Sequence, residues 1–366
     1  MENTIALVGG GTAGHIWPTI EVGKVLRKLR PEVKIIYLGG KGSQEEKIAK
    51  DENFDFFYIS AAKWDRFLSL RNVLTPFKIL KGIFDARRVL KENKVNVLFA
   101  KGGFVSFPVV IAASSLKIPI LGHESDSAMG QTNYLLLRFM KKMATAFPTG
   151  LYPEKIRKKL IYSGIPLREE FYHIDIRKAK KDFEILDNLP VLVVTGGSQG
   201  ALAINRLIWE MLDVLLDNCQ IIHLTGGKSF KMAQNIREKL SKEQKKRYKI
   251  FDYSFRMAEI LSLADLVISR AGANTLFELA YLKKPTILIP YPYAAQNHQE
   301  KNAFFVKSLG GAQVFLERNL DEKIFFETIL YFLNHKEEAQ AMAKRMQALY
   351  VKNSAKIIAR EILSLL

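Results

Sequence analysis

Two stretches of the chain, residues 5–26 and 191–212, follow one plan of apolar strand, glycine-rich turn and helix. The first reads IALVGGGTAGHIWPTIEVGKVL and the second reads VLVVTGGSQGALAINRLIWEML. Each begins a series in which short apolar runs alternate with helical patterns, which is typical of parallel sheets covered by helices. Because the series starts again halfway along 366 residues, we predict an α/β protein with two parallel-sheet domains.

The apolar runs that follow each start predict the remaining strands. In the first half we expect strands at 34–39, 56–60, 95–100, 119–124 and 143–148. In the second half we expect them at 220–226, 248–253, 265–269, 286–290 and 312–316.

The domain boundary is predicted near Ser163–Pro166, in the sequence SGIP. This gives an N-terminal domain of residues 1–163 and a C-terminal domain of residues 164–344. The helical pattern from about 345 to 366 is long enough to pack back on the N-terminal domain.

Composition and charge limit the kinds of site and partner that this chain can have. The single cysteine, Cys219, excludes a disulfide framework and a cysteine zinc site. We read the apolar run at the N-terminus as a first strand rather than a signal peptide, because it has no basic segment before it. The net charge of +18 is compatible with nucleic acid, an anionic membrane surface or an acidic substrate. We predict no nucleic-acid partner, since the chain contains no recognition motif.

The segment Ser269–Ala303 carries the strongest functional signal. An apolar strand ends at a turn around Gly272, and the start of the next helix points backbone N–H groups at whatever lies above the turn. Glu278 lies one turn into that helix, where a carboxylate can bind the hydroxyls of a ribose. His298 and Gln299 follow the next strand and suit sugar hydroxyls. Together they predict a nucleotide-sugar site.

The other glycine-rich turns are weaker signals on their own. The turn at 9–14 matches neither a dinucleotide fingerprint nor a P-loop, and His15 beside it is either a general base or a packing residue. The turn at 196–200 would hold a diphosphate through Ser198 and backbone N–H groups. Arg168 and Arg270 are candidate phosphate cations or members of ion pairs.

Ligands of open α/β sheets bind at the carboxyl ends of the strands, so two such domains facing each other would form a cleft. We predict that a group of polar residues from the N-terminal domain lines this cleft. It comprises Gly102, Gly103, His123, Glu124, Asp126 and Asn133. The alternative is ordinary loop capping, with Asp126 as a helix N-cap. No Asp-x-Asp pair occurs, so we expect no metal cofactor, and helix dipoles would carry the charge of a leaving diphosphate.

Segment 63–94 mixes nine Lys and Arg residues, against three Asp and Glu, with large apolar side chains. Such a helix either lies on anionic lipid or buries its apolar side in its own domain. The candidate membrane contacts are Trp64, Phe67, Phe77, Leu80 and Phe84.

The motifs GGTAGH, GGSQGA and Ser269–Ala303 resemble, in this order, the bacterial N-acetylglucosaminyltransferases that form lipid II, the MurG family. The resemblance covers nearly the whole chain. It implies the GT-B fold, in which two Rossmann-like domains face each other across a cleft. It also implies inverting, metal-independent transfer of GlcNAc from UDP-GlcNAc to lipid I by a peripheral enzyme on the cytoplasmic face of the inner membrane.

The resemblance assigns roles to individual residues. His15 matches a proposed catalytic base, Glu278 a ribose-binding glutamate, and His298 with Gln299 the pair that reads GlcNAc hydroxyls. The full donor-binding set that we predict is Thr12, Gly14, Arg168, Ser198, Gln199, Gly200, Ser254, Ala273, Asn274, Glu278, His298 and Gln299.

The chain departs from the family pattern in four places. Ala13 replaces a glycine, His123–Asp126 reads HESD instead of HEQN, and Ile165–Arg168 reads IPLR instead of NPVR. The uracil loop, often FIDDM, reads YSFRM at 253–257. The alternatives are another GT-B enzyme, such as a diacylglycerol glycosyltransferase or a UDP-GlcNAc 2-epimerase, and a non-catalytic binder of nucleotide sugars or of anionic lipid.

Overall fold

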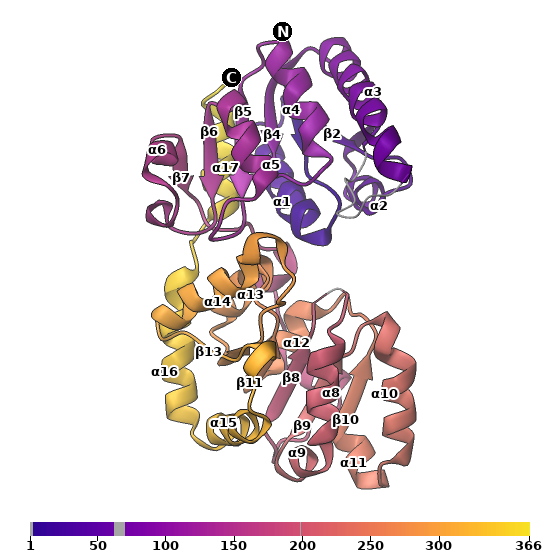
Figure 1. The fold of residues 1–366 in the computed structure, drawn as a ribbon, viewed down its shortest axis with the longest axis vertical. Coiled ribbons are helices and arrows are strands. Elements are labelled where there is room, and N and C mark those ends of the chain that lie inside the picture. The colour runs from indigo at the N-terminus through magenta and orange to yellow at the C-terminus, as the bar shows by residue number, and fades with distance from the viewer. Residues whose placement is uncertain (1–2, 62–69, 198) are drawn as a thin grey trace. The chain divides into compact units, whose positions relative to one another are not determined.

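The computed structural model describes residues 3–61, 70–197 and 199–366. It divides into two compact units (Figure 1). Unit 1 comprises Met1–Arg168 with Val351–Leu366, and unit 2 comprises Glu169–Tyr350. Each unit contains one parallel sheet flanked by helices, which confirms the predicted fold class of two parallel α/β domains.

Unit 1 is built on a seven-stranded sheet in the order β3-β2-β1-β4-β5-β6-β7. The strands are β1 Thr4–Val8, β2 Lys34–Gly39, β3 Asp55–Tyr58, β4 Val95–Ala100, β5 Ile120–Glu124, β6 Lys142–Thr145 and β7 Leu160–Tyr162. The sequence patterns identified all of these except β7. This edge strand has only three residues, too few for an apolar alternation to show.

Helices cover both faces of this sheet, because successive strand residues point to opposite sides. Ile5 and Leu7 of β1 pack with α1 (Ala13–Leu29), α2 (Gln44–Asp51) and α17 (Ser354–Leu363). Ala6 and Val8 pack on the other face, with α3 and α4. The remaining helices of unit 1 are α3 Leu70–Glu92, α4 Ser106–Ser115, α5 Gln131–Leu136 and α6 Glu154–Arg157, with short 3-10 turns at Leu137–Phe139 and Thr149–Leu151.

Unit 2 is built on a six-stranded sheet in the order β10-β9-β8-β11-β12-β13. Its strands are β8 Val191–Thr195, β9 Gln220–Leu224, β10 Tyr248–Phe251, β11 Leu266–Ser269, β12 Thr286–Leu288 and β13 Gln313–Val314. Its helices are α7 Ile176–Asp182, α8 Leu202–Glu210, α9 Leu212–Asn218, α10 Gly227–Lys239, α11 Lys242–Arg247, α12 Met257–Leu263, α13 Ala273–Leu282, α14 His298–Ser308, α15 Glu322–Asn334 and α16 Lys336–Met346. Short 3-10 turns lie at Glu169–Tyr172, Ala295–Asn297, Glu317–Asn319 and Gln347–Leu349.

The C-terminal segment contains a helix that packs on unit 1, as predicted, but this helix is α17 (Ser354–Leu363), so the predicted start near 345 is wrong. α16 ends at Met346, a 3-10 turn covers Gln347–Leu349, and α17 begins at Ser354 after its N-cap Asn353, which has a φ of +61°. The break separates two apolar faces with different cores. Met346 is buried in unit 2, whereas Ile358 is buried in unit 1 against the α1 side of the sheet.

Candidate functional site

In unit 1 the turns after β1 and β4 contact each other through their backbones. Gly103 has a φ of +81°, and a Cβ there would collide with the carbonyl oxygen of Gly10. A Cβ on Gly9 would likewise collide with the Thr19 hydroxyl. Small residues are therefore required at both turns, and this brings the 9–14 and 101–106 segments together at the carboxyl end of the sheet.

His15 lies at this junction, half-buried in the first turn of α1. Its Nδ1 is 2.8 Å from the hydroxyl of Thr12. A Cβ built on Gly103 would lie 3.8 Å from the same nitrogen. The structure thus brings together three predicted site residues, and Gly14, a fourth, is part of the same helical turn.

Lys101, at the end of β4, is a candidate site residue that the sequence patterns missed. It is only 1% exposed, and its ammonium group donates a hydrogen bond to the Ser125 hydroxyl. Burial lowers the pKa of Lys101 to about 8, although the charges of Glu124 and Asp126 act in the opposite direction. The available signal was a lysine placed directly after a buried strand and before two glycines.

Glu124 organises the loop that follows β5. Its carboxylate accepts hydrogen bonds from the backbone N–H groups of Asp126 at 3.0 Å and Gly130 at 2.9 Å, and from the Asn133 side chain at 2.9 Å. Burial raises the pKa of Glu124, and the charge of Asp126 adds to this effect. The predicted acceptor-side residues therefore form one cluster. Asp126 is not a helix N-cap, because Gly130 caps α5.

His123 does not line an accessible surface, so that part of the prediction is wrong. The side chain is fully buried, and its Nε2 donates a hydrogen bond to the carbonyl oxygen of Gly164 at 3.0 Å. Burial, together with the charge of Lys101, lowers the pKa of His123 well below its usual value. The ring is neutral and ties β5 to the segment after β7. β5 is buried along its length because it lies inside the sheet between β4 and β6.

Arg168 packs within unit 1. Its guanidinium lies over the ring of Trp17 on α1, 5.7 Å from the ring centroid. Arg168 is the last residue of this segment of unit 1, and unit 2 begins with the next residue, Glu169.

In unit 2 the turns after β8 and β9 are in backbone contact. Gly200 and Gly226 have φ values of +72° and +79°, and a Cβ on Gly200 would collide with the carbonyl oxygen of Thr225. Asn205 of α8 donates a hydrogen bond to that carbonyl at 2.9 Å, and His223 contacts the Asn205 side chain at 3.0 Å. Buried polar groups thus hold the glycine turns. Gln199 is exposed there, whereas Ser198 lies outside the described residues.

The turn after β11 leads into α13, whose N-cap is Gly272. Ala273 is buried, while Asn274 and Glu278 are half-buried on the first turns of the helix. Arg270, just before the turn, donates hydrogen bonds to the carbonyl oxygens of Ile289 and Pro290 at 3.0 and 3.2 Å.

Arg270 also forms an ion pair with Glu317 at 2.5 Å. This pair is largely buried and lies within unit 2, so it is not the surface or interdomain ion pair that was the alternative, and the phosphate role of Arg270 stays a prediction. The buried arginine ties the turn after β11 to the segments that follow β12 and β13.

The loop after β12 contains two consecutive left-handed residues, Gln296 and Asn297, with φ of +53° and +55°. Non-glycine residues adopt this conformation at a cost in free energy, and such residues cluster at ligand sites. His298 Nδ1 lies 2.8 Å from the Ala295 carbonyl oxygen, and the Gln299 side chain accepts a hydrogen bond from the Tyr291 N–H at 3.0 Å. Both predicted sugar readers therefore contact the backbone of this loop.

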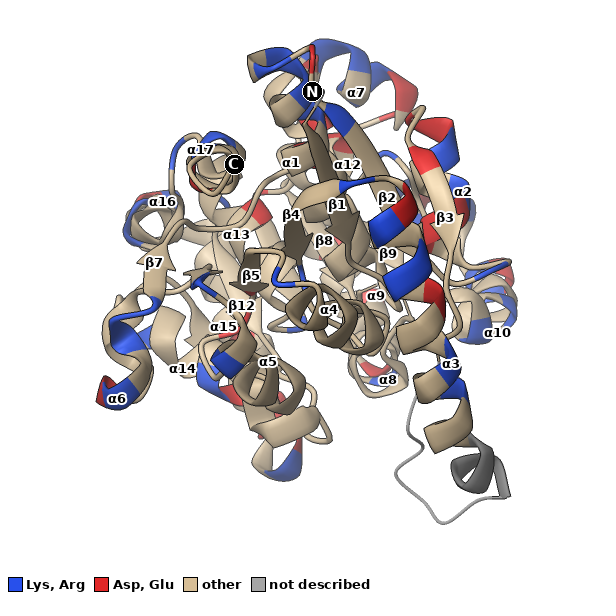
Figure 2. Ribbon diagram, turned by 90° about the horizontal axis from the view of Figure 1, so that it is seen from above, with Lys and Arg blue, Asp and Glu red and all other residues tan. Residues whose placement is uncertain are grey.

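Helix α3 carries the predicted membrane contacts that the structure describes. Phe77, Leu80 and Phe84 are 69%, 53% and 70% exposed, so the interpretation that they pack in their own domain is wrong. Their helical spacing places them on one face. Figure 2 shows basic residues along the same helix. Trp64 and Phe67 lie outside the described residues.

The described residues contain neither a metal-ligand cluster nor a helix suited to span a membrane. No group of three or more His, Cys, Asp and Glu side chains is arranged there to hold a metal ion. Within the same residues, no helix combines the length and the apolar character needed to cross a membrane.

Comparison with known proteins identifies the family. The glycosyltransferase family 28 N-terminal domain matches residues 5–145, and the glycosyltransferase family 28 C-terminal domain matches residues 191–360. A UDP-N-acetylglucosamine--N-acetylmuramyl-(pentapeptide) pyrophosphoryl-undecaprenol N-acetylglucosamine transferase from Clostridium tetani is 38% identical over 92% of both chains. The chain belongs to this family, the MurG transferases. A relative of the same name from Acetivibrio thermocellus is 33% identical over 97% of this chain and 96% of its own.

Solved structures agree with membership in the MurG family. The crystal structure of Acinetobacter baumannii MurG matches with a TM-score of 0.76 and 26% identity, over 99% of each chain. The Neisseria meningitidis UDP-GlcNAc 2-epimerase bound to UDP-GlcNAc matches with a TM-score of 0.70 at 13% identity, over 100% of each chain, and shows only a shared fold. The GT-B fold and the family resemblance are therefore both confirmed.

Proposed function

We propose that this MurG-family chain transfers GlcNAc from UDP-GlcNAc to the C4 hydroxyl of MurNAc in undecaprenyl-pyrophosphoryl-MurNAc-pentapeptide, lipid I, and so forms lipid II. The observation that carries the proposal is the 38% identity, over 92% of the chain, to a transferase named for this reaction. The glycine turns of both units, which would contact phosphate and sugar groups through their backbones, support it.

The donor would bind to unit 2, where the turns after parallel strands gather at one edge of the sheet. The diphosphate would contact the turn at 196–200 and the start of α13. Glu278 would bind the ribose hydroxyls, and the loop holding His298 and Gln299 would bind GlcNAc.

The acceptor would bind to unit 1. His15, held by its contact with Thr12, would accept the proton from the attacking C4 hydroxyl as UDP leaves. The loop closed by Glu124 would lie beside the acceptor.

We also propose that no metal or other cofactor takes part. The negative charge on the leaving diphosphate would be stabilised by backbone N–H groups and by the dipole of α13. These groups are fixed before the substrate binds, so they stabilise the charge without reorganising.

The lipid-linked acceptor would be reached from the cytoplasmic face of the inner membrane, with the enzyme bound peripherally. The exposed apolar face of α3 would insert among anionic lipids, and neighbouring lysines and arginines such as Lys81 and Arg88 would contact their head groups. No nucleic acid is part of this proposal.

The test is UDP release from UDP-GlcNAc with and without a lipid I analogue, in EDTA. We expect release that depends on the acceptor and is unaffected by EDTA. Release that EDTA abolishes would contradict the metal-free mechanism. Conversion of UDP-GlcNAc to UDP-ManNAc without the lipid acceptor and without net release of UDP would instead support a 2-epimerase. Binding of UDP without any turnover would support a non-catalytic nucleotide-sugar binder.

A further inference from the structure

The loop 252–256 joins β10 to α12 and lies beside the glycine turns of unit 2. β10 pairs with β9, and the N–H of Thr225 donates a hydrogen bond to the Phe251 carbonyl at 2.9 Å. Thr225 in turn precedes Gly226, whose backbone touches that of Gly200. The loop therefore borders the turns to which we assign the diphosphate, at the carboxyl end of the sheet.

This loop presents two aromatic rings to solvent. Tyr253 and Phe255 are 40% and 74% exposed, and their ring centroids lie 4.9 Å apart at an interplanar angle of 83°. Exposed aromatic rings next to a phosphate-binding turn are suited to stack on a nucleobase, because every base has an apolar π face.

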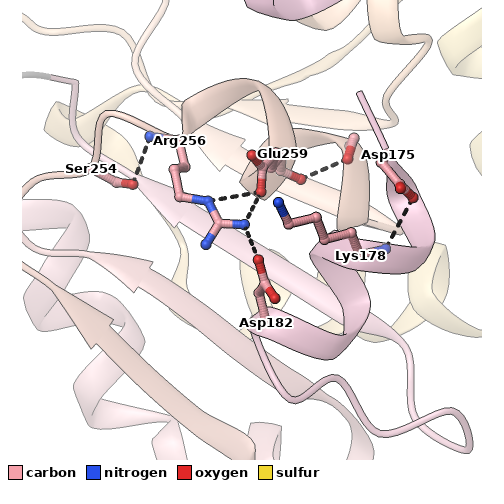
Figure 3. Close-up of polar contacts among 7 residues, drawn as sticks. Asp175, Lys178, Asp182, Ser254, Arg256 and Glu259 are labelled. Atoms are coloured by element: carbon pink, nitrogen blue, oxygen red, sulfur yellow. Dashed lines mark hydrogen bonds and ion pairs between the residues drawn. The ribbon is translucent and has the colours of Figure 1, made fainter. Parts of the chain in front are cut away.

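The loop is held at its end by Arg256. Its Nε donates to the Glu259 carboxylate at 2.8 Å, and its terminal nitrogen donates to Asp182 at 2.6 Å and also to Glu259 (Figure 3). The guanidinium lies over the Phe183 ring, 4.8 Å from the centroid. The Arg256 backbone N–H donates to the Ser254 hydroxyl at 3.0 Å. One residue thus connects the loop to both α7 and α12.

Asp182, one of the two carboxylates that bind Arg256, belongs to a regular helix. Asp182 is the last residue of α7, a helix whose N-cap, Asp175, accepts a hydrogen bond from the Lys178 N–H at 3.0 Å (Figure 3). The Arg256 guanidinium is paired with the carboxylates of both Asp182 and Glu259, so its removal would leave two like charges on neighbouring elements without this shared partner. The position of the loop therefore depends on the arginine.

We propose that Arg256 is a positioning residue for the donor: it fixes the 252–256 loop so that Tyr253 and Phe255 meet the base of the nucleotide. The proposal rests on the proposed function, because it takes UDP-GlcNAc as the ligand.

The test compares the full-length chain with Arg256→Ala and Arg256→Lys. For Arg256→Ala we expect the KM for UDP-GlcNAc and the Kd of UDP to rise about tenfold, since hydrogen bonds to charged groups are lost at a partly exposed site. We expect kcat and the KM for the acceptor to stay within about twofold. Arg256→Lys keeps the charge but loses the planar fork, so its effect should be intermediate.

Two further measurements separate positioning from a general loss of structure. Uridine should lose affinity by the same factor as UDP, whereas inhibition by inorganic pyrophosphate should stay unchanged, because the glycine turns are intact. Lys246→Ala, which removes the exposed ion pair with Glu243 on α11, is the matched control and should leave the Kd of UDP as in the parent.

The outcomes are distinguishable. Parent-like UDP and uridine affinity in Arg256→Ala would overturn the proposal, and so would an equal loss for pyrophosphate and acceptor. A parent chain that binds UDP but transfers no GlcNAc would overturn the proposed function, while the UDP and uridine affinities would still decide the role of Arg256.

Discussion

At the scale of single residues, the structure separates partly exposed polar side chains beside the glycine turns from polar side chains that are fully buried. His15 lies in the first turn of α1 beside the turn containing Gly103. This is the position from which we propose that it accepts the proton of the acceptor hydroxyl. His123, which the sequence grouped with it, is buried and bonded to the Gly164 carbonyl. The two histidines therefore have different environments: His15 lies at the start of a helix, and His123 lies inside a buried strand.

The first prediction concerns His15. Changing His15 to Ala should lower kcat roughly 10²- to 10⁴-fold, the range attributed to general-base catalysis. The Kd of UDP should not change, because the donor binds to unit 2. Steady-state kinetics and UDP titration test this. A variant with near-normal kcat would remove His15 from the role of base.

The second prediction concerns the buried cluster around Lys101. Changing Lys101 to Met leaves the buried carboxylate of Glu124 without its positive neighbour, so the free energy of unfolding of unit 1 should fall by about 2–4 kcal/mol. Adding Glu124→Gln removes the charge that was left unpaired and should recover part of the loss. Urea unfolding of the two single variants and the double variant measures the coupling. Additive losses would show that the two groups do not interact.

At the scale of elements, α3 has one set of apolar residues in the core of unit 1 and another set exposed to solvent. Ala86, Val89 and Leu90 pack in the core of unit 1, while Phe77, Leu80 and Phe84 stay exposed. The apolar periodicity of the sequence is consistent with both environments, and the structure shows which residues occupy each.

The third prediction is that α3 binds anionic membranes. Changing Phe77, Leu80 and Phe84 together to Ser should reduce binding to vesicles that contain phosphatidylglycerol more than tenfold, because three apolar side chains no longer insert. The variant should unfold at the same temperature as the parent, since these side chains are exposed. Ile324→Ser, which alters an exposed apolar residue of α15, is the matched control. Flotation that is unchanged by the triple substitution would rule out this face.

At the scale of the whole molecule, the chain returns to its first unit at the end. α17 supplies Ile358, Ala359 and Ile362 to the core that Ile5 and Leu7 share with α1. The last residues of the sequence therefore complete the domain that the first residues begin.

The fourth prediction follows from this crossing. Changing Ile358 and Ile362 to Ala should destabilise unit 1 by about 4–10 kcal/mol, because each fully buried isoleucine that becomes alanine costs about 2–5 kcal/mol. Unit 2 should be unaffected. Calorimetry should show one unfolding transition moving to lower temperature. Ile329→Ala, in the core of unit 2, should move the other transition. A shift of both transitions by the α17 variant would show that the units unfold together.

The sequence by itself determined the two parallel α/β units, nearly all of their strands and the glycine turns, because these follow from local periodicity and from backbone angles that glycine alone adopts easily. Only the tertiary structure decided that Arg270 pairs with Glu317, that Arg256 is bound by Asp182, and that the C-terminal segment is interrupted between Met346 and Ser354. These outcomes depend on which residues, distant in sequence, come to lie opposite each other. A charged side chain has the same local pattern whether its partner is a ligand or another part of the chain.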